Sequence, residues 1–459
     1  MLLKVVILVG GETTGTRFRP LSMDVPKVLF PIAGKPLISH IIDNIVSQVE
    51  DQLSEILLLG FFKDTSKFDE YLETTKGIYP DLKIRYLSEP YPMGTGGGLQ
   101  YFKNEIASKS DPHGKVMIIH GDIVTIYPFK KMLDFYESKK ANSIILGIDP
   151  LILMNNSQNT VQVQNQNSYK TYEKDKLLSN YGTIIANKET SEVVHYVEKP
   201  SSKLSKFQTI ASYDTFISGG IYLFNDIFFK LLDEAQKEKS SKLNHFSMDD
   251  IDDDTVDANI LSLELDVLKI LASEKQGKFY TLKSNSFWYQ LKTPVSALLA
   301  NSFFLERCLQ SEFKSELMQP SINIYPPVKI WGSDLPGAQG YKIGPNVSIG
   351  RKVKIGSGTR LKNCIIGDNV SIGDNTFIAN AIISKGVKIG KWCRIEGTMD
   401  NSTISKDLTR VKSDGYFKII NNIVVLCENT TVCNQVFVYN SIVLPHKELK
   451  NDIKYEIVM

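Results

Sequence analysis

The chain has 459 residues, of which 42% are hydrophobic and 23% are charged, and its formal net charge is +2. These totals are ordinary for a globular protein of about three domains, and they give no reason to expect nucleic acid as a partner. No apolar run reaches the roughly 18 residues that a membrane-spanning helix needs, so no membrane contact is expected. The five cysteines are scattered and form no CxxC pair, which favours reduced thiols and a cytoplasmic location.

Buried strands alternate with amphipathic helices over the first two-thirds of the chain. Residues 5–9 are continuously apolar and mostly β-branched, which predicts a strand covered on both faces. A helix is predicted over 35–49, where apolar residues recur at helical spacing. The other predicted elements are strands at 55–60, 83–87, 115–120 and 143–148 and a helix at 129–140. The alternation predicts an α/β fold: a doubly wound, Rossmann-like domain over 1–315, with ligands beyond the carboxyl ends of parallel strands.

A different pattern begins near residue 340. Aliphatic residues, often followed by glycine, recur at six-residue spacing, starting with Ile343, Ile349, Ile355 and Leu361. This hexapeptide period predicts a left-handed parallel β-helix over 341–459, joined to the first domain by a linker at 316–340. The period stops over 397–424. An insert of that length is too long for an ordinary loop, so we expect it to have a function.

Two further segments are predicted to be solvated loops. Residues 155–167 are dominated by asparagine and glutamine and contain too few apolar residues to pack. Residues 249–257 carry six aspartates. A metal site in this acidic run is conceivable, but like charges in a run repel one another and stay hydrated, which favours an exposed loop.

The stretch GGETTGTRFRP, residues 10–20, follows the first predicted strand. Its glycines allow the backbone to approach an anion, and successive loop N–H groups can form a nest for phosphate. Arg17 adds a planar cationic fork and Lys27 a point charge. An exposed ion pair is the alternative explanation for Arg17. The candidate phosphate-binding residues of this segment are Gly10, Gly11, Gly15, Thr16, Arg17 and Lys27.

Three more motifs follow predicted strands or apolar runs. Residues 94–98 read Gly-Thr-Gly-Gly-Gly, a nearly bare backbone that could pass beneath a flat base or make a simple turn. Asp122 directly follows the strand predicted over 115–120, and Mg²⁺ prefers one or two carboxylates together with phosphate oxygens. Glu198 and Lys199 stand side by side after another apolar run, where a lysine can meet a phosphate and a glutamate can accept sugar hydroxyls. Alone, this last pair would be an exposed charged turn.

In their order along the chain, these motifs resemble those of the nucleotide-sugar pyrophosphorylases, which join a nucleoside triphosphate to a sugar 1-phosphate and release pyrophosphate. The resemblance covers nearly the whole chain, the β-helix included. The C-terminal YNSIVLPHKEL, residues 439–449, favours the branch that handles GTP, mannose 1-phosphate and GDP-mannose. The other matching segments lie at 15–40, 89–99, 120–129, 180–185, 195–200, 218–224, 264–280 and 287–294.

The resemblance implies a role for each motif. The glycine loop, Thr16 and the catalytic residues Arg17 and Lys27 would hold the triphosphate. Asp122 would bind Mg²⁺. The guanine pocket would be lined by Gly94, Thr95, Gly96 and Gly97, and the sugar phosphate would be held by Gly182, Glu198, Lys199 and Ser218.

Three departures from the family pattern stand at or near this site. Glu12, Thr13 and Thr14 occupy a position where the family has a single residue, and Glu12 adds negative charge where triphosphate should lie. Gln290 stands where the active family has an aspartate that gives Mg²⁺ a second carboxylate, so the metal site is weakened. Ser218 replaces the usual asparagine near the sugar. The sugar and base elements are therefore better kept than the triphosphate elements.

This pattern favours a regulatory chain that binds GDP-mannose but makes little or none of it. Such a chain, by the resemblance, associates with a catalytic beta subunit in a hetero-oligomer, with a homodimer as a further option, and imposes feedback by GDP-mannose. The insert at 397–424 is then a candidate for reaching the partner. One alternative is an active enzyme that uses GTP and mannose 1-phosphate. A second is a non-enzymatic subunit of the translation-initiation guanine-nucleotide exchange complex.

Overall fold

The computed structural model describes residues 2–12, 16–23, 25–107, 114–152, 178–200, 212–244, 260–273, 278–311, 315–331, 340–398, 411–413, 416–418 and 423–459. Among these, residues up to 12, from 41 to 152 and from 178 to 288 form one compact unit, and residues 16–40 and 289 onward form another. The units differ in extent from the predicted domains because residues 16–40 and the chain just after 288 group with the β-helix. As domain limits, 1–315 and 341–459 stay predictions.

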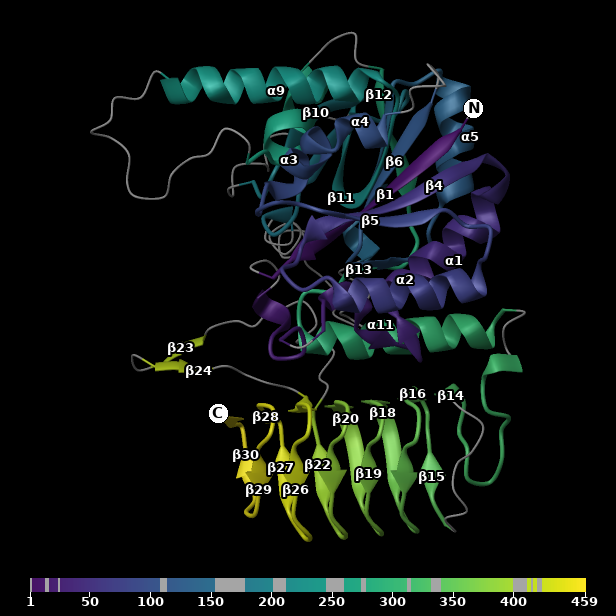
Figure 1. The fold of residues 1–459 in the computed structure, drawn as a ribbon, viewed down its shortest axis with the longest axis vertical. Coiled ribbons are helices and arrows are strands. Elements are labelled where there is room, and N and C mark those ends of the chain that lie inside the picture. The colour runs from purple at the N-terminus through teal and green to yellow at the C-terminus, as the bar shows by residue number, and fades with distance from the viewer. Residues whose placement is uncertain are drawn as a thin grey trace. The chain divides into compact units, whose positions relative to one another are not determined.

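The first unit is built on a mixed sheet with a parallel centre (Figure 1). The parallel strands are β6 (Lys115–His120), β1 (Leu3–Gly11), β4 (Leu53–Phe61) and β5 (Ile84–Ser88), in that order across the sheet. They confirm the strands predicted from buried apolar runs. The long strand β11 (Tyr213–Phe224) runs antiparallel to β6 and extends the sheet to β8 (Ser143–Ile148), β9 (Thr183–Asn187), β10 (Val193–Val197) and β12 (Phe279–Ser284).

Helices cover this sheet. Those in or entering the first unit are α1 (Leu37–Val49), α2 (Ser66–Ile78), α3 (Gly94–Tyr101), α4 (Lys103–Ile106), α5 (Phe129–Lys139), α9 (Ile227–Asn244), the π-helix η6 (Leu263–Leu268) and α10 (Lys269–Ser273). One buried cluster joins the sheet to α3, α9 and η6 through residues such as Val6, Leu99, Leu232 and Val267. The predicted helix over 35–49 begins only at Leu37, because Lys35 and Pro36 pair with the strand Pro31–Ile32.

The predicted β-helix is confirmed in the second unit (Figure 1). Its coils repeat in parallel register, so that Leu361 pairs with Ile378 and Ile378 with Ile395. The aliphatic residues of the hexapeptide period point inward and form one continuous buried cluster. Ile395 then pairs directly with Val438, so the register passes across the insert without a break. The principal strands include β16 (Val347–Ile349), β18 (Arg360–Ile366), β20 (Phe377–Ile383), β22 (Arg394–Glu396) and β27 (Phe437–Tyr439).

Within the insert, β23 (Val411–Ser413) and β24 (Tyr416–Lys418) form a two-stranded antiparallel ladder. The Asn/Gln-rich segment 155–167 and the acidic segment 249–257 lie outside the described residues, as does Gly15.

Candidate functional site

The carboxyl end of β1 is bare backbone for a steric reason. Gly10 has φ 80°, and a Cβ atom on Gly11 would lie 2.9 Å from the carbonyl oxygen of Phe61 at the end of β4. The next residue, Glu12, stays close to this edge: its carboxylate accepts a hydrogen bond from the Lys63 N–H at 2.7 Å. An exposed acidic side chain is therefore held in the loop that was predicted to take triphosphate.

The glycines of the second motif form the first turn of α3 and pack against residues 261–263. The N–H groups of Gly96 and Gly97 both donate to the Leu261 carbonyl oxygen, at 2.8 and 3.3 Å. A Cβ atom on Gly94 would lie 2.4 Å from that same oxygen. Close packing within the chain thus explains why these positions are glycine, in addition to their predicted role at the base. The same packing keeps Thr95 next to the π-helix η6.

An acidic side chain that the motifs did not single out lies behind this turn. Glu89 follows β5, and its Oε1 would be 2.0 Å from a Cβ atom on Gly98. Burial raises the pKa of Glu89 to about 7, and the N–H of Met93 opposes that shift by hydrogen bonding to the carboxylate. Perturbed carboxyls of this kind gather at functional sites. The only sequence signal was its place at the head of the EPYPMGTGGGL segment.

The end of β6 brings His120 and Asp122 to the same edge of the sheet. The N–H of Gly121 donates to the Leu8 carbonyl at 2.9 Å, which holds this turn beside β1. Asp122 is half-buried at the position predicted for it. His120 turns inward instead, where its Nε2 lies 3.1 Å from Glu264 Oε1. Sequence inspection missed this pair because its members are far apart along the chain.

The four residues predicted to hold the sugar phosphate lie together. The Ser218 N–H donates to the Gly182 carbonyl at 2.8 Å. Glu198 accepts a hydrogen bond from the Tyr196 hydroxyl at 3.0 Å, and a Cβ atom on Gly182 would collide with both groups. Lys199 is exposed, and its Nζ lies 3.5 Å from Glu198 Oε1. With φ 43°, Lys199 adopts a left-handed conformation that is uncommon for a lysine and often marks a functional position.

Arg17 and Lys27 belong to the second unit. Arg17 is exposed within the short helix η1 (Thr16–Phe18), which begins at Thr16, and Lys27 is half-buried at the start of η2 (Lys27–Leu29). The segment is fixed to helix α11 (Pro294–Leu309) by the Ala33 N–H, which donates to Asn301 Oδ1 at 2.9 Å. His40 stacks on Phe304 with ring centroids 3.8 Å apart. Burial lowers the pKa of His40 well below its usual value, so this ring is neutral.

Comparisons with known proteins agree along the whole chain. A family model described as nucleotidyl transferase matches residues 4–151 and 143–267, and one described as GMPPB C-terminal domain matches residues 336–458. A probable mannose-1-phosphate guanyltransferase of Schizosaccharomyces pombe is 33% identical over 471 residues, covering 100% of both chains. Mannose-1-phosphate guanylyltransferase regulatory subunits alpha-A of Danio rerio and alpha of Xenopus tropicalis are each 32% identical, again over 100% of both chains. The chain belongs to the mannose-1-phosphate guanylyltransferase family.

The residues that the family pattern relates to Mg²⁺ are Asp122 and Gln290, and Mg²⁺ binding by this chain stays a prediction. Asp122 supplies one carboxylate, whereas the side chain of Gln290 offers only a neutral carbonyl oxygen to a hard cation. Across the described ranges, no three or more His, Cys, Asp or Glu side chains come together in a way that could hold a metal ion.

Two further findings concern membrane-spanning helices and disulfides. No helix within the described ranges is both long and apolar enough to span a membrane. All five cysteines are among the described residues, and none is in a disulfide.

Proposed function

We propose that the chain is a GDP-mannose-binding regulatory subunit of mannose-1-phosphate guanylyltransferase with weak or no catalysis of its own. The observation that carries the proposal is an asymmetry within the predicted site. On the sugar side, the Ser218 N–H donates to the Gly182 carbonyl, Glu198 accepts a hydrogen bond from Tyr196, and Lys199 Nζ lies 3.5 Å from Glu198. On the triphosphate side, the loop carries Glu12, and Gln290 stands where the family pattern has a second metal-binding carboxylate.

The residues assigned to the sugar could bind GDP-mannose, the product that already carries mannose. In the proposed complex, Glu198 accepts hydrogen bonds from sugar hydroxyls, because an ionised carboxylate is an acceptor with two oxygens. Lys199 is exposed and can reach a phosphate as a flexible point charge. Gly94, Thr95, Gly96 and Gly97 line the guanine, and Gly10, Gly11, Gly15, Thr16, Arg17 and Lys27 meet the phosphates.

The triphosphate side explains the weak catalysis. Glu12 repels a phosphate chain that carries extra negative charge, which disfavours GTP more than GDP-mannose. Any Mg²⁺ would be held by Asp122 and nucleotide phosphates, without help from a carboxylate at position 290. Metal-assisted stabilisation of charge contributes several kcal/mol in such reactions, and each 1.4 kcal/mol is about tenfold in rate. The combined loss amounts to several orders of magnitude in turnover.

A binding subunit implies a catalytic partner. The names of the alpha relatives include the words regulatory subunit, which supports association with a catalytic beta subunit and feedback by GDP-mannose. The insert at 397–424 leaves the β-helix without disturbing its register, so it is available as the element that reaches the partner. Deletion of the insert should then abolish feedback in the reconstituted complex while leaving GDP-mannose binding intact. A cytoplasmic location is proposed with it, supported by cysteines without disulfides.

Calorimetry on the purified chain tests the proposal. We would titrate with GDP-mannose, then with GTP and Mg²⁺, and follow pyrophosphate release on the same sample. The expected result is tight GDP-mannose binding, weak GTP binding and no turnover. Turnover at ordinary enzyme rates of ~1–1000 per second would overturn it.

An active guanylyltransferase is the second candidate. It is favoured by the retained Asp122 at the end of β6 and by the Schizosaccharomyces pombe relative, whose name carries the activity without the word regulatory. The same pyrophosphate assay separates the two functions.

A further inference from the structure

One buried carboxylate lies beneath the residues assigned to the nucleotide sugar. Glu264 is in the first turn of η6, and its side chain is 15% exposed. Its Oε2 accepts hydrogen bonds from the hydroxyls of Thr95 at 2.6 Å and Ser262 at 3.1 Å, and its Oε1 faces His120. Burial alone raises the pKa of Glu264, but the His120 ring and the Thr95 hydroxyl outweigh burial and lower that pKa to about 2. This buried side chain therefore stays ionised.

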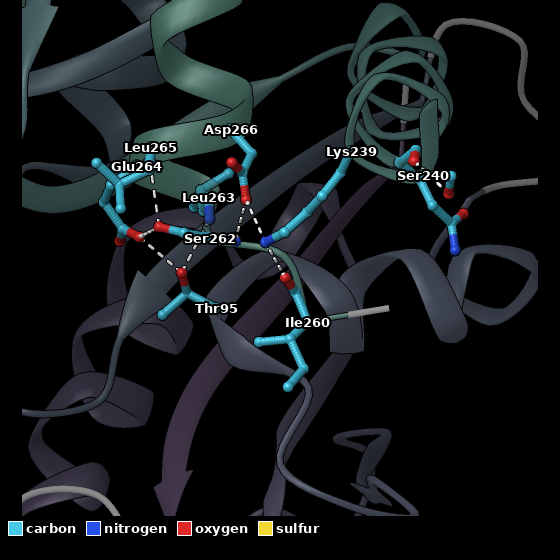
Figure 2. Close-up of polar contacts among 10 residues, drawn as sticks. Thr95, Lys239, Ser240, Ile260, Ser262, Leu263, Glu264, Leu265 and Asp266 are labelled. Carbon is cyan, nitrogen blue, oxygen red and sulfur yellow. Dashed lines mark hydrogen bonds and ion pairs between the residues drawn. The ribbon is translucent and has the colours of Figure 1, made fainter. Parts of the chain in front are cut away.

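A second carboxylate on the same helix already anchors the local chain (Figure 2). Asp266 Oδ2 accepts a hydrogen bond from the Ser262 N–H at 2.8 Å and lies 3.4 Å from Lys239 Nζ on α9. Lys239 also donates to the Ile260 carbonyl, so residues 260–266 are held from that side. A buried ion pair adds little net stability compared with apolar packing. Stability alone therefore does not account for Glu264, the carboxylate that is turned toward Thr95 and His120.

The contacts of Glu264 lead to both ends of the proposed ligand. At one end, Thr95 is part of the segment assigned to the base. At the other, the ring of His120 packs edge-on against Tyr222 with centroids 5.9 Å apart. The Tyr222 hydroxyl in turn lies 3.3 Å from the hydroxyl of Ser218, which is assigned to the sugar. A continuous series of half-buried contacts thus joins the two ends through one carboxylate.

We propose that Glu264 is a positioning residue for the nucleotide sugar: it fixes Thr95 at the base end and, through His120 and Tyr222, Ser218 at the sugar end. This inference rests on the proposed function, because it requires GDP-mannose to be the ligand of the site. Since the same side chain sets both ends, its loss should weaken binding of the whole ligand more than binding of the nucleotide alone.

The test compares Glu264→Gln with a matched control, Asp266→Asn, on the same helix. Both changes remove one charge and keep the size of the side chain. We would titrate each variant with GDP-mannose and with GDP, and record thermal unfolding. Glu264→Gln should lower GDP-mannose affinity about tenfold and GDP affinity less than about threefold. Asp266→Asn should leave the ratio of the two affinities at its wild-type value, even if it lowers the melting temperature as much as Glu264→Gln does.

Thr95→Val is a second variant, in which a methyl group replaces one hydroxyl. It keeps the proposal testable if Glu264→Gln fails to fold. It should lower GDP-mannose affinity at least threefold, and wild-type affinity in this variant would overturn the proposal. Equal affinity losses in Glu264→Gln and Asp266→Asn would also overturn the positioning role while leaving the proposed function in place. Absence of GDP-mannose binding in the wild type would overturn both.

Discussion

The Tyr196 hydroxyl donates a hydrogen bond to Glu198 across 3.0 Å, and Gly182 lies directly against the pair. Burial raises the pKa of Tyr196 well above its usual value, and the neighbouring Tyr222 and Glu198 add to the effect. The phenol therefore keeps its proton and donates a hydrogen bond to the carboxylate at any physiological pH. A Cβ atom at position 182 would stand 2.1 Å from that hydroxyl and 2.8 Å from Glu198 Oε2. The sugar side of the site thus depends on the absence of a side chain at this position.

Gly182→Ala should therefore displace Glu198 and Tyr196 from each other. We expect GDP-mannose affinity to fall at least tenfold, and overpacking of this buried position to cost about 1–3 kcal/mol of folding free energy. Calorimetry and urea unfolding measure the two effects. Gly77→Ala is the control, because a Cβ there meets nothing within 4 Å and the change removes a flexible residue from α2. It should stabilise slightly and leave binding unchanged. An unaltered affinity in Gly182→Ala would show that Glu198 does not hold the ligand.

Glu89→Gln should stabilise the protein at high pH only. The pKa of Glu89 is raised from 4.5 to about 7, first of all by burial, so the folded state disfavours the charged form. The corresponding stability is fully present below pH 4.5 and is lost as the pH rises through 7. The full shift corresponds to about 3.4 kcal/mol, which partial exposure reduces to about 1–2 kcal/mol.

Urea unfolding of Glu89→Gln and wild type at pH 5 and pH 8 measures this difference. The variant should gain about 1–2 kcal/mol over wild type at pH 8 and much less at pH 5. The control is Glu73→Gln, at an exposed position on α2. Its difference from wild type in the free energy of unfolding should be the same at pH 5 and pH 8. A Glu89→Gln variant that is less stable than wild type at pH 8 would mean that the contacts of the charged carboxylate, the Met93 N–H among them, outweigh the cost of burying it.

The sequence could predict elements whose signal is local. The limits of β6 and β8 match the predicted strands because each is a single buried apolar run bounded by polar residues. The antiparallel strands around β11 were not predicted, since strand direction depends on where the chain reverses and periodicity does not record it. Motifs at strand ends could be expected to meet, as Gly182, just before β9, and Glu198, just after β10, do. The contact between His120 and Glu264 joins distant segments and leaves no local pattern to recognise.

Asn301→Ala should destabilise the second unit. The fully buried Asn301 amide oxygen accepts hydrogen bonds from the Ala33 N–H at 2.9 Å and from the Ser348 hydroxyl on β16 at 2.8 Å. Its removal leaves two buried donors unsatisfied, which costs about 2–4 kcal/mol in all. Hydrogen exchange should show faster exchange at Ala33. Ser302→Ala, on the next residue of α11, removes a single half-buried contact to Asn363 and should cost less than about 1 kcal/mol. Equal losses in the two variants would argue against Asn301 as the anchor.

Gln290→Asp tests whether the proposed weakness of catalysis results from the metal donors. By the family resemblance, an aspartate at this position joins Asp122 in holding Mg²⁺, so the change restores a charged ligand for a cation that prefers carboxylate oxygen. We expect Mg²⁺-dependent pyrophosphate release to rise at least tenfold over wild type, because one recovered carboxylate should contribute at least 1.4 kcal/mol to the transition state. GDP-mannose affinity, measured without metal, should stay within about threefold of wild type. Gln290→Asn shortens the side chain equally without adding charge and should leave turnover unchanged. If Gln290→Asp released pyrophosphate no faster than wild type, Glu12 and the longer loop would be the dominant obstacle to catalysis. Shortening that loop would then be the change that restores pyrophosphate release.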